Sequence, residues 1–485
     1  MSKILFITQR YAPAYGGAEI YVKKLAEWCV KNGHEVDVWT SDALEADALW
    51  YPKRGKVELL QEDINGVHVR RFKTSPFFLN NVFINKGFRY VMWHMPSWHL
   101  QCLGSPPMCI GMYAQLLKGY SKLPKYDIIH VSAMPYNSLF YVGMNLAKRT
   151  GAKLYITPFA HSNVTGKYVL EDKYFHPRVL PFYDRADKIF VQTDAEKNSL
   201  INFFDTYKGA VSPSDVVKYG YDNFGRGGGR EEVKISNSTP TILFYLAKIF
   251  ITLVSLPIFL SHLVTKPFRK RSDRSIDVNK FVKVGLGVEP EEVLVGDGER
   301  FRKNNGIERE TPIVFFVGAR EAVKGVNNLV NASEILWEKG KKFKLVLAGN
   351  NSIAFEEFWK EKSELVKNNS IVLERPSDQE KWDLFDAGNL FVMVSKSESF
   401  GIVYLEAWLY KKAVIGCDIE AVNEVIDNGK DGYTLPFDDS NLLAQKIEYL
   451  LNNKDVLKKM GDSGYNKVMK QYTWKEKFRI LSKYF

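Results

Sequence analysis

Short runs in which almost every position is apolar recur along the chain, and most are followed by a segment with helical periodicity. The clearest runs lie in the second half, at Ile313–Val317, Lys344–Ala348 and Leu390–Val394. A strand that is apolar on both faces is typical of a parallel sheet covered by helices on both sides. Alternating strands and helices then imply right-handed βαβ units and a doubly wound sheet.

This alternation occurs twice, over about 1–205 and again over about 280–470. In the first half, strands are expected at Lys3–Thr8 and Lys153–Thr157, with a helix at Ala18–Lys31 after the first of them. We therefore predict an α/β protein with two Rossmann-like doubly wound domains that face each other across a cleft. Ligands of such sheets bind beyond the carboxyl ends of the strands, so the site is expected in that cleft.

Two stretches break the pattern and set the expected domain limits. An irregular aromatic insertion at about 76–120 lies inside the N-terminal domain, which is expected over 1–208. A second insertion, apolar and basic, occupies 209–279 and separates the domains. The C-terminal domain is then expected over 280–470, with a final helix over 471–485.

The second insertion contains an apolar run at Thr241–Val264. The run is long enough to span a bilayer, for which about 20 apolar residues suffice. A single crossing would put the two domains on opposite sides of the membrane and prevent a shared cleft. A re-entrant hairpin broken near Pro257, or a helix lying in the interface, avoids this conflict. The basic residues that follow suit anionic headgroups, so we expect contact with the cytoplasmic membrane face through about 241–274. The alternative is a buried helix or an oligomer contact.

Composition narrows the class of protein. Of the 485 residues, 45% are hydrophobic and 25% charged, which is ordinary for a globular protein and excludes a wholly disordered or polytopic membrane chain. The 4 cysteines are too few for a disulfide framework and lack the spacing of a zinc site. The apolar run at Ile4–Ile7 is too short for a secretory signal, so a cytoplasmic location is expected. A formal net charge of +11 favours an anionic partner.

The most specific chemical motif is the nine-residue segment Glu398-Ser-Phe-Gly-Ile-Val-Tyr-Leu-Glu406, which follows a buried strand and enters a helix. Gly401 would let a ligand approach the backbone closely, and the helix N-terminus would offer N–H groups to a phosphate. The two carboxylates would then flank the phosphate and accept hydrogen bonds from hydroxyls of two different sugars. The alternative is an acidic first turn that only complements the helix dipole.

Glycine turns follow the first predicted strand of each domain. The turn after Ile313–Val317 carries Arg320 and Lys324, and a guanidinium fork with an ammonium point charge fits a diphosphate, although a solvated basic loop is the alternative. In the N-terminal domain, Gly16 and Gly17 would bring backbone amides to the same phosphates. A Gly-Gly turn between strand and helix is common, so this second signal is weak by itself.

A histidine occupies the loop after another buried strand, in the segment Thr157-Pro-Phe-Ala-His161. Its side chain would face the cleft and could bond a substrate hydroxyl or a developing charge. A single loop histidine is more often without a special role. His161 is therefore a candidate only in combination with the other motifs.

Together these motifs resemble the retaining glycosyltransferases of family 4, glycosyl transferases group 1, which have the GT-B fold. The resemblance covers roughly 1–205 and 280–485, and it extends to Gly287-Val-Glu289 and to Tyr472-Thr-Trp474. In the family, the last helix crosses back to the N-terminal domain. The resemblance implies retaining transfer from a nucleotide-diphosphate sugar. With the apolar insertion, it predicts an acceptor that is lipid-linked or a surface glycan precursor.

The resemblance also implies roles for single residues. Arg320 and Lys324 would neutralise the diphosphate leaving group, His161 would bond the donor sugar near its reacting carbon, and Glu406 would hold the ribose. Glu398 would hold the donor sugar. The other donor contacts would come from glycines that close over the phosphates and from the nine-residue motif: Gly16, Gly17, Ser399, Phe400, Gly401 and Ile402. The family generally needs neither a metal nor another cofactor, and the sequence has no credible D-x-D site.

The family's mechanism is usually described as front-face attack with the leaving phosphate as base, which agrees with the lack of an obvious enzymic nucleophile. The sequence departs from the family in the segment Asp418–Glu424, which lacks the Gly-Gly element that often precedes a glutamate there. Two other hypotheses are a different GT-B nucleotide-sugar enzyme, such as an epimerase, and a basic non-enzymatic binding protein. No recognised nucleic-acid motif is present, so no nucleic-acid partner is expected.

Overall fold

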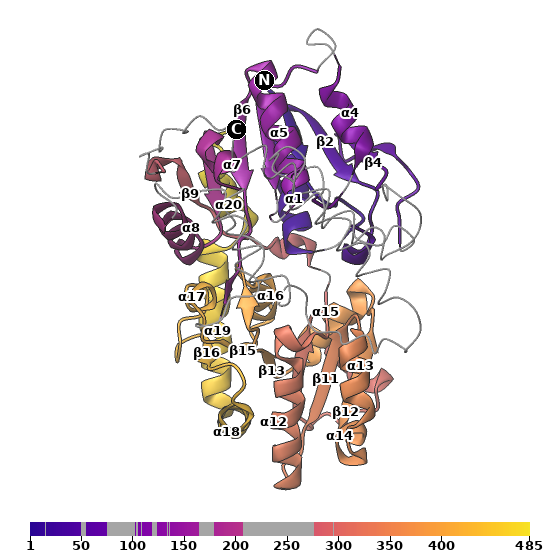
Figure 1. Ribbon diagram of the computed structural model, residues 1–485. Helices are drawn as coiled ribbons and strands as arrows, with labels where there is room; N and C mark the ends of the chain where they lie inside the picture. The colour runs from indigo at the N-terminus through magenta and orange to yellow at the C-terminus, as the bar shows by residue number, and fades with distance from the viewer. Residues whose placement is uncertain are drawn as a thin grey trace, which may run out of the picture.

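Two sheets organise the protein in a computed structural model of the chain (Figure 1). The structure describes residues 1–14, 16–49, 55–74, 102, 105–107, 109–118, 124–132, 134, 136–163, 179–206, 276–293 and 295–485. The predicted apolar segment 241–264 and most of the insertion 76–120 lie outside the described residues. Among those that are described, no helix combines the length and the apolarity that a bilayer crossing requires.

The first sheet has eight strands in the order β3-β4-β2-β1-β5-β6-β8-β9. All neighbours are parallel except β3 and β4. The strands are β1 (Lys3–Ile7), β2 (Glu35–Ser41), β3 (Gln61–Ile64), β4 (Val67–Phe72), β5 (Ile128–Ser132), β6 (Lys153–Thr157), β8 (Lys188–Val191) and β9 (Phe281–Lys283). The accompanying helices are α1 (Gly17–Lys31), α4 (Ile110–Leu116), α5 (Asn137–Thr150), α7 (Leu180–Arg185) and α8 (Asp194–Thr206). We call this sheet and its helices the first lobe.

The second sheet has six parallel strands in the order β12-β11-β10-β13-β15-β16, and with its helices it forms the second lobe. The strands are β10 (Ile313–Val317), β11 (Lys344–Gly349), β12 (Ser370–Glu374), β13 (Leu390–Met393), β15 (Ala413–Cys417) and β16 (Gly432–Leu435). The helices are α11 (Gly298–Asn304), α12 (Val326–Glu338), α13 (Ile353–Lys360), α14 (Glu364–Asn369), α15 (Asp378–Ala387), α16 (Ile402–Leu409), α17 (Glu420–Asn423), α18 (Ser440–Asn452) and α19 (Lys454–Gln471).

The predicted α/β architecture with two doubly wound parallel sheets is confirmed. Phe315, Val346 and Phe391 on neighbouring strands have no exposed surface, as expected for strands covered by helices on both sides. Strand β9 lies just beyond the predicted boundary at 280, yet it pairs with β8 in the first sheet. Its Phe281 and Val282 are buried there, so the first sheet draws its edge strand from the far side of the second insertion.

Within the described residues, two passages of the chain between the lobes lie side by side. The backbone N–H of Val288 donates to Tyr472 O at 2.8 Å, and the N–H of Trp474 donates to Val288 O at 3.0 Å. Helix α20 (Trp474–Leu481) then packs on α1, with the rings of Trp28 and Phe478 stacked at 5.1 Å. Figure 1 shows α19 running from the second lobe toward the first, with both chain ends near the first sheet.

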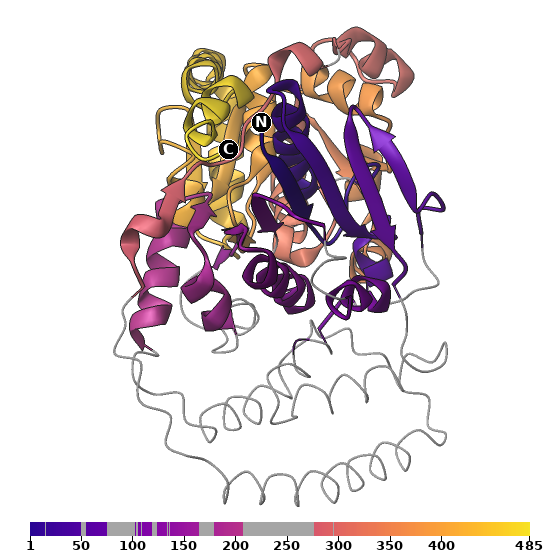
Figure 2. The same cartoon turned by 90° about the horizontal axis from the view of Figure 1, so that it is seen from above.

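A third, two-stranded sheet joins the lobes. Strand β7 (Ser162–Asn163) follows β6 and pairs antiparallel with β14 (Ser397–Glu398), which follows β13. These residues are more than 230 positions apart in sequence and come from the carboxyl ends of one strand in each sheet. Seen from above in Figure 2, the first sheet lies in front of the elements of the second lobe. This ladder brings the loops with the predicted chemistry to one place.

Candidate active site

The pairing of β7 with β14 sets His161 beside the nine-residue motif. In this ladder Glu398 lies opposite Ser162, the residue after the histidine. His161 Nδ1 lies 3.3 Å from the hydroxyl oxygen of Ser397. Two predicted site regions from different halves of the chain are therefore in contact.

Lys324 joins the same cluster from the loop after β10. Its Nζ lies 2.6 Å from Glu398 Oε1. The next residue, Gly325, has φ 75°, and a Cβ at this position would lie 2.2 Å from the carbonyl oxygen of Val394. Only glycine allows the loop to pack this closely against the end of β13. That packing places the ammonium group beside the carboxylate.

The cluster has perturbed ionisation. Burial alone would raise the pKa of Glu398, but the charge of Lys324, its hydrogen bond and the charge that His161 gains at low pH outweigh it, so the pKa lies below its ordinary value. Burial lowers the pKa of His161 to about 4; Glu398 opposes this shift and Lys324 adds to it. At neutral pH the Glu398 carboxyl is therefore ionised and the His161 imidazole is neutral.

The motif residues after Glu398 form the start of α16. Gly401 caps this helix with φ 86°, and a Cβ there would lie 2.5 Å from the ring of Tyr404. Phe400 is buried with its ring 5.7 Å from that of Tyr472, while Ser399 and Ile402 remain partly exposed. The first backbone N–H groups of α16 therefore follow directly on the cluster, where a helix terminus favours negative charge.

Glu406, the second carboxylate of the motif, has a partner that the sequence did not indicate. Its Oε1 lies 2.7 Å from Nζ of Lys381, and both side chains are almost fully buried. Lys381 belongs to α15 and lies 4.4 Å from the ring centre of Trp382. The sequence does contain a capping box, Ser377 and Glu380, which indicates that a helix starts just before Lys381. It does not indicate that this lysine contacts Glu406.

Arg320, predicted to face the diphosphate together with Lys324, has hydrogen-bond partners of its own at the ends of β11 and β12. Its side chain is fully buried, with Nη1 donating to Leu347 O at 2.7 Å and to Leu373 O at 2.8 Å. Its Nε donates to Asn351 Oδ1 at 2.7 Å. The backbone of Arg320 forms an extended bridge with Asn351, which directs the guanidinium toward the ends of β11 and β12. These contacts occupy Nη1 and Nε, whereas the buried Nη2 has no hydrogen-bond partner in the described part of the chain.

The two glycines of the first lobe lie at the start of α1. Gly16 has an extended backbone, and a Cβ there would lie 2.3 Å from Oε2 of Glu19. Glu19 is itself buried and pairs with Arg10 Nη2 at 2.7 Å. Gly16 is thus needed for the close approach of this carboxylate, and Gly17 begins the helix.

Two further features bear on the choice of site. Within the described ranges, no three or more histidine, cysteine, aspartate or glutamate side chains gather as they would around a metal ion.

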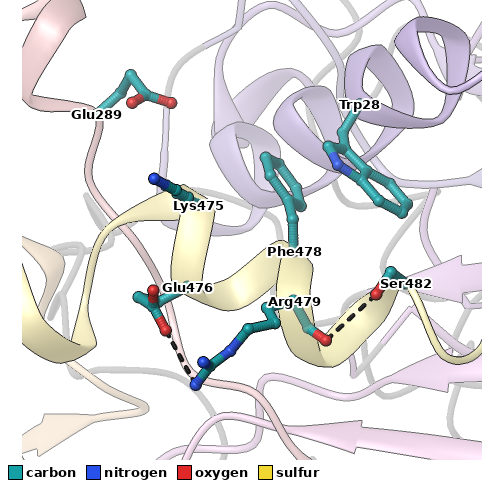
Figure 3. Close-up of a pocket in the computed structure, with 7 residues that line it drawn as sticks. All are labelled: Trp28, Glu289, Lys475, Glu476, Phe478, Arg479 and Ser482. Carbon is teal, nitrogen blue, oxygen red and sulfur yellow. Dashed lines mark hydrogen bonds and ion pairs between the residues drawn. The ribbon is translucent and has the colours of Figure 1, made fainter.

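A separate pocket lies between α1 and α20 and is drawn in Figure 3. Its lining residues are Trp28, Glu289, Lys475, Glu476, Phe478, Arg479 and Ser482. None of the predicted site residues lines this pocket.

Sequence comparison matches both halves of the chain to glycosyltransferase domains. Residues 297–467 match the family described as glycosyl transferases group 1, and residues 16–208 match the glycosyl transferase 4-like domain. One relative is the capsular polysaccharide biosynthesis glycosyltransferase CapM of Staphylococcus aureus, 26% identical over 211 residues, or 41% of this chain and 54% of the relative. Another is the N-acetyl-alpha-D-glucosaminyl L-malate synthase of Bacillus anthracis, 28% identical over 192 residues, or 39% and 48%. The chain spans about half the length of the curated relatives it matches.

Solved structures show the same fold. Sucrose-phosphate synthase from Thermosynechococcus elongatus superimposes with a TM-score of 0.64 at 16% identity, covering 100% of this chain and 98% of that one. HepE from Anabaena, in complex with UDP and glucose, gives 0.61 at 14% identity, covering 100% and 99%. These likenesses establish the GT-B fold that the sequence predicted.

Proposed function

Because the chain belongs to the group 1 glycosyltransferases, we propose that it transfers a sugar from a nucleotide-diphosphate sugar to an acceptor with retention of configuration. The observation that carries the proposal is the cluster at the junction of the lobes. There His161 from the first lobe lies beside the segment of Glu398, which is paired with Lys324. An ammonium, a carboxylate and a neutral imidazole next to a helix N-terminus suit a phosphorylated sugar.

Lys324 and the start of α16 bind the departing diphosphate in this proposal. An ammonium group has three N–H donors, and the bond to Glu398 uses one of them. The others can reach phosphate oxygens, and the first N–H groups of α16 add a second source of positive potential. Such preorganised charge stabilises the negative charge that develops as the leaving group departs. Because Nη1 of Arg320 donates to Leu347 O and Leu373 O, we propose that Arg320 mainly supports this loop and that Lys324 provides the phosphate contact.

Glu398 and His161 face the sugar. The ionised Glu398 accepts a hydrogen bond from a sugar hydroxyl, and the neutral His161 bonds a second polar group near the reacting carbon. The bond between the sugar carbon and the phosphate oxygen breaks, and a bond to the acceptor oxygen forms on the same face. The acceptor's proton passes to the leaving phosphate. This sequence of events needs neither an enzymic nucleophile nor a metal ion.

Glu406 holds the ribose of the nucleotide in this proposal. Its contact with Lys381 fixes one of its oxygens. The other oxygen can accept from a ribose hydroxyl. The structural relative HepE was solved with UDP, so uridine diphosphate sugars form the first group to test.

The acceptor in this proposal is lipid-linked or a surface glycan precursor, reached at the cytoplasmic membrane face through about 241–274. The apolar run and the basic residues after it support this placement. Deletion of 235–275 should release the protein from anionic lipid vesicles in a sedimentation assay. Unchanged sedimentation would contradict the membrane contact but would leave the transfer reaction in place.

A panel of nucleotide sugars tests the reaction itself. Thermal shift identifies the donor, and turnover with a membrane extract then measures transfer, with and without EDTA. Lys324→Ala and Glu406→Ala should abolish donor turnover while the melting curve stays cooperative. Full activity in both variants would refute the site. An epimerised donor formed without acceptor would support an epimerase instead.

A further inference from the structure

Glu196, in the first turn of α8, connects two segments of the first lobe. Its carboxylate is almost fully buried, and each oxygen has its own backbone donor. Oε1 accepts from the N–H of Ala160 at 2.6 Å, and Oε2 accepts from the N–H of Gln192 at 2.6 Å. Ala160 directly precedes His161. One carboxylate therefore ties the loop that carries the histidine to the end of β8.

Capping of α8 does not require this carboxylate. The hydroxyl of Thr193 accepts from the N–H of Glu196 at 3.1 Å, and the carbonyl of Thr193 accepts from Lys197 N at 3.2 Å. Groups outside the helix bind the two preceding N–H groups. The Glu196 side chain is therefore available to bind the histidine loop. Burying a carboxyl group costs free energy unless it makes hydrogen bonds such as those to Ala160 and Gln192.

The second lobe holds the same end of α8. Glu424, which follows α17, accepts from Asp194 N at 2.8 Å and from Ala195 N at 2.6 Å. Lys283, on β9, lies 2.6 Å from Glu424 Oε2 and 2.7 Å from Asp194 Oδ2. A carboxylate at a helix N-terminus is stabilising. The residue next to these two N–H groups is Glu196 itself.

We propose that Glu196 is a positioning residue for His161, and that it acts from a helix end which the second lobe holds through Glu424. This inference rests on the proposed function, since it takes His161 to be a sugar-binding group. The contacts form a closed circuit, from Glu424 through the start of α8 to Glu196, Ala160 and His161, and back to Ser397 in the second lobe. Separation of the lobes breaks this circuit at both of its junctions.

The two oxygens of the carboxyl group explain why this residue is a glutamate. Burial raises the pKa of Glu196 to about 8, so the group is protonated at neutral pH, but a carboxylic acid keeps acceptor lone pairs on both oxygens. Glutamine would offer one acceptor oxygen to two N–H donors and would direct an NH₂ group, which cannot accept, at the other. Aspartate is one methylene shorter and cannot keep both 2.6 Å contacts. Each change leaves a buried N–H without an acceptor, which loosens the histidine loop.

Glu196→Gln tests the proposal by hydrogen–deuterium exchange and by kinetics. Exchange of the amides in 158–163 should increase, while exchange in the second sheet stays the same. The turnover number should fall about 10- to 100-fold, because a small misplacement of a reacting group has that effect. The donor KM should change less than about threefold. Glu334→Gln, which alters the Glu334–Lys362 pair on the second lobe, is the matched control.

A double variant separates positioning from a general structural role. If Glu196 acts through His161, Glu196→Gln adds no further loss of turnover to His161→Ala. Losses that multiply would overturn the proposal. Glu424→Gln should show the same increase in exchange to a smaller extent. This variant replaces Glu196→Gln in the test if Glu196→Gln does not fold. Absence of any nucleotide-sugar turnover in the wild type would refute the proposed function alone. Unchanged exchange at 158–163 in both variants would refute the positioning role.

Discussion

Lys324 Nζ lies 2.6 Å from Glu398 Oε1, and this ion pair links the loops that follow two neighbouring strands, β10 and β13. The carboxylate is 9% exposed and the lysine 25%, so the pair is partly shielded from water. A shielded pair interacts more strongly than a surface pair, and each partner would be costly to leave alone. The ion pair therefore joins two loops of the second lobe and sets the charge of the site.

Lys324→Met should weaken binding of a nucleoside diphosphate about tenfold or more, because it removes the ammonium that we propose to bind the phosphates. It should also raise the pKa of Glu398, which loses its main charged partner. Calorimetric titration measures the affinity. Lys362→Met is the control, since it removes a comparable Lys–Glu pair from the same lobe. Equal affinity in wild type and Lys324→Met would contradict the assignment.

Arg320→Met should affect stability rather than donor binding. The change leaves the buried carbonyl of Leu347 and the partly buried carbonyl of Leu373 without their donor, at an expected cost of about 2–4 kcal/mol in unfolding free energy. Denaturant titration measures this loss. The donor KM of the folded enzyme should change less than about twofold. A large rise in KM with unchanged stability would instead restore Arg320 to the phosphate site.

Lys381→Met should raise the donor KM and leave the turnover number nearly unchanged. Without the lysine, Glu406 loses its buried partner, so its carboxylate is held less firmly for the proposed contact with the ribose. Lys381→Arg keeps the charge and should recover part of the loss. A drop in turnover number at constant KM would place Lys381 at the reacting bond rather than at the nucleoside.

The pH dependence of stability should carry a signature of Glu196. Burial raises the pKa of Glu196 to about 8 from an ordinary 4.5, despite the two backbone N–H bonds that lower it. Between these values the folded chain keeps a proton that the unfolded chain releases. Stability therefore falls as pH rises from 4.5 to 8, by up to about 4 kcal/mol. Urea unfolding at pH 5 and pH 8 should show a smaller fall in Glu196→Gln. Equal falls would show that Glu196 does not titrate in this range.

The strands were the part of the fold that the sequence could predict. Runs such as Ile313–Val317 are apolar at every position, which is typical of a strand that is buried on both faces of a sheet. Lys324 and Glu398 could be named as candidates because each follows such a strand. The pairing of β7 with β14 could not be predicted, since both strands have two residues and carry no periodicity.

Other features were hidden because they depend on tertiary packing. Arg320 and Lys324 lie four positions apart in one turn, and the sequence does not reveal that the first is directed into the sheet. Lys381 meets Glu406 across 25 positions, and Glu424 meets Ala195 across 229. The lack of glycine in Asp418–Glu424 marked this loop as different from the family. Only the three-dimensional structure shows that Glu424 binds the N-terminal end of α8 in the first lobe.

The paired passages at Val288 and Trp474 have a consequence for dissecting the molecule. Tyr484 and Phe485 pack into the first lobe, where the ring of Phe485 lies 5.4 Å from Tyr155 and 5.9 Å from Phe190. A fragment cut ahead of β10 would thus expose an aromatic hollow, and a peptide of residues 472–485 supplied in trans should bind there and complement it. The first lobe can therefore be prepared without the second only if the C-terminal segment that contains α20 is supplied with it.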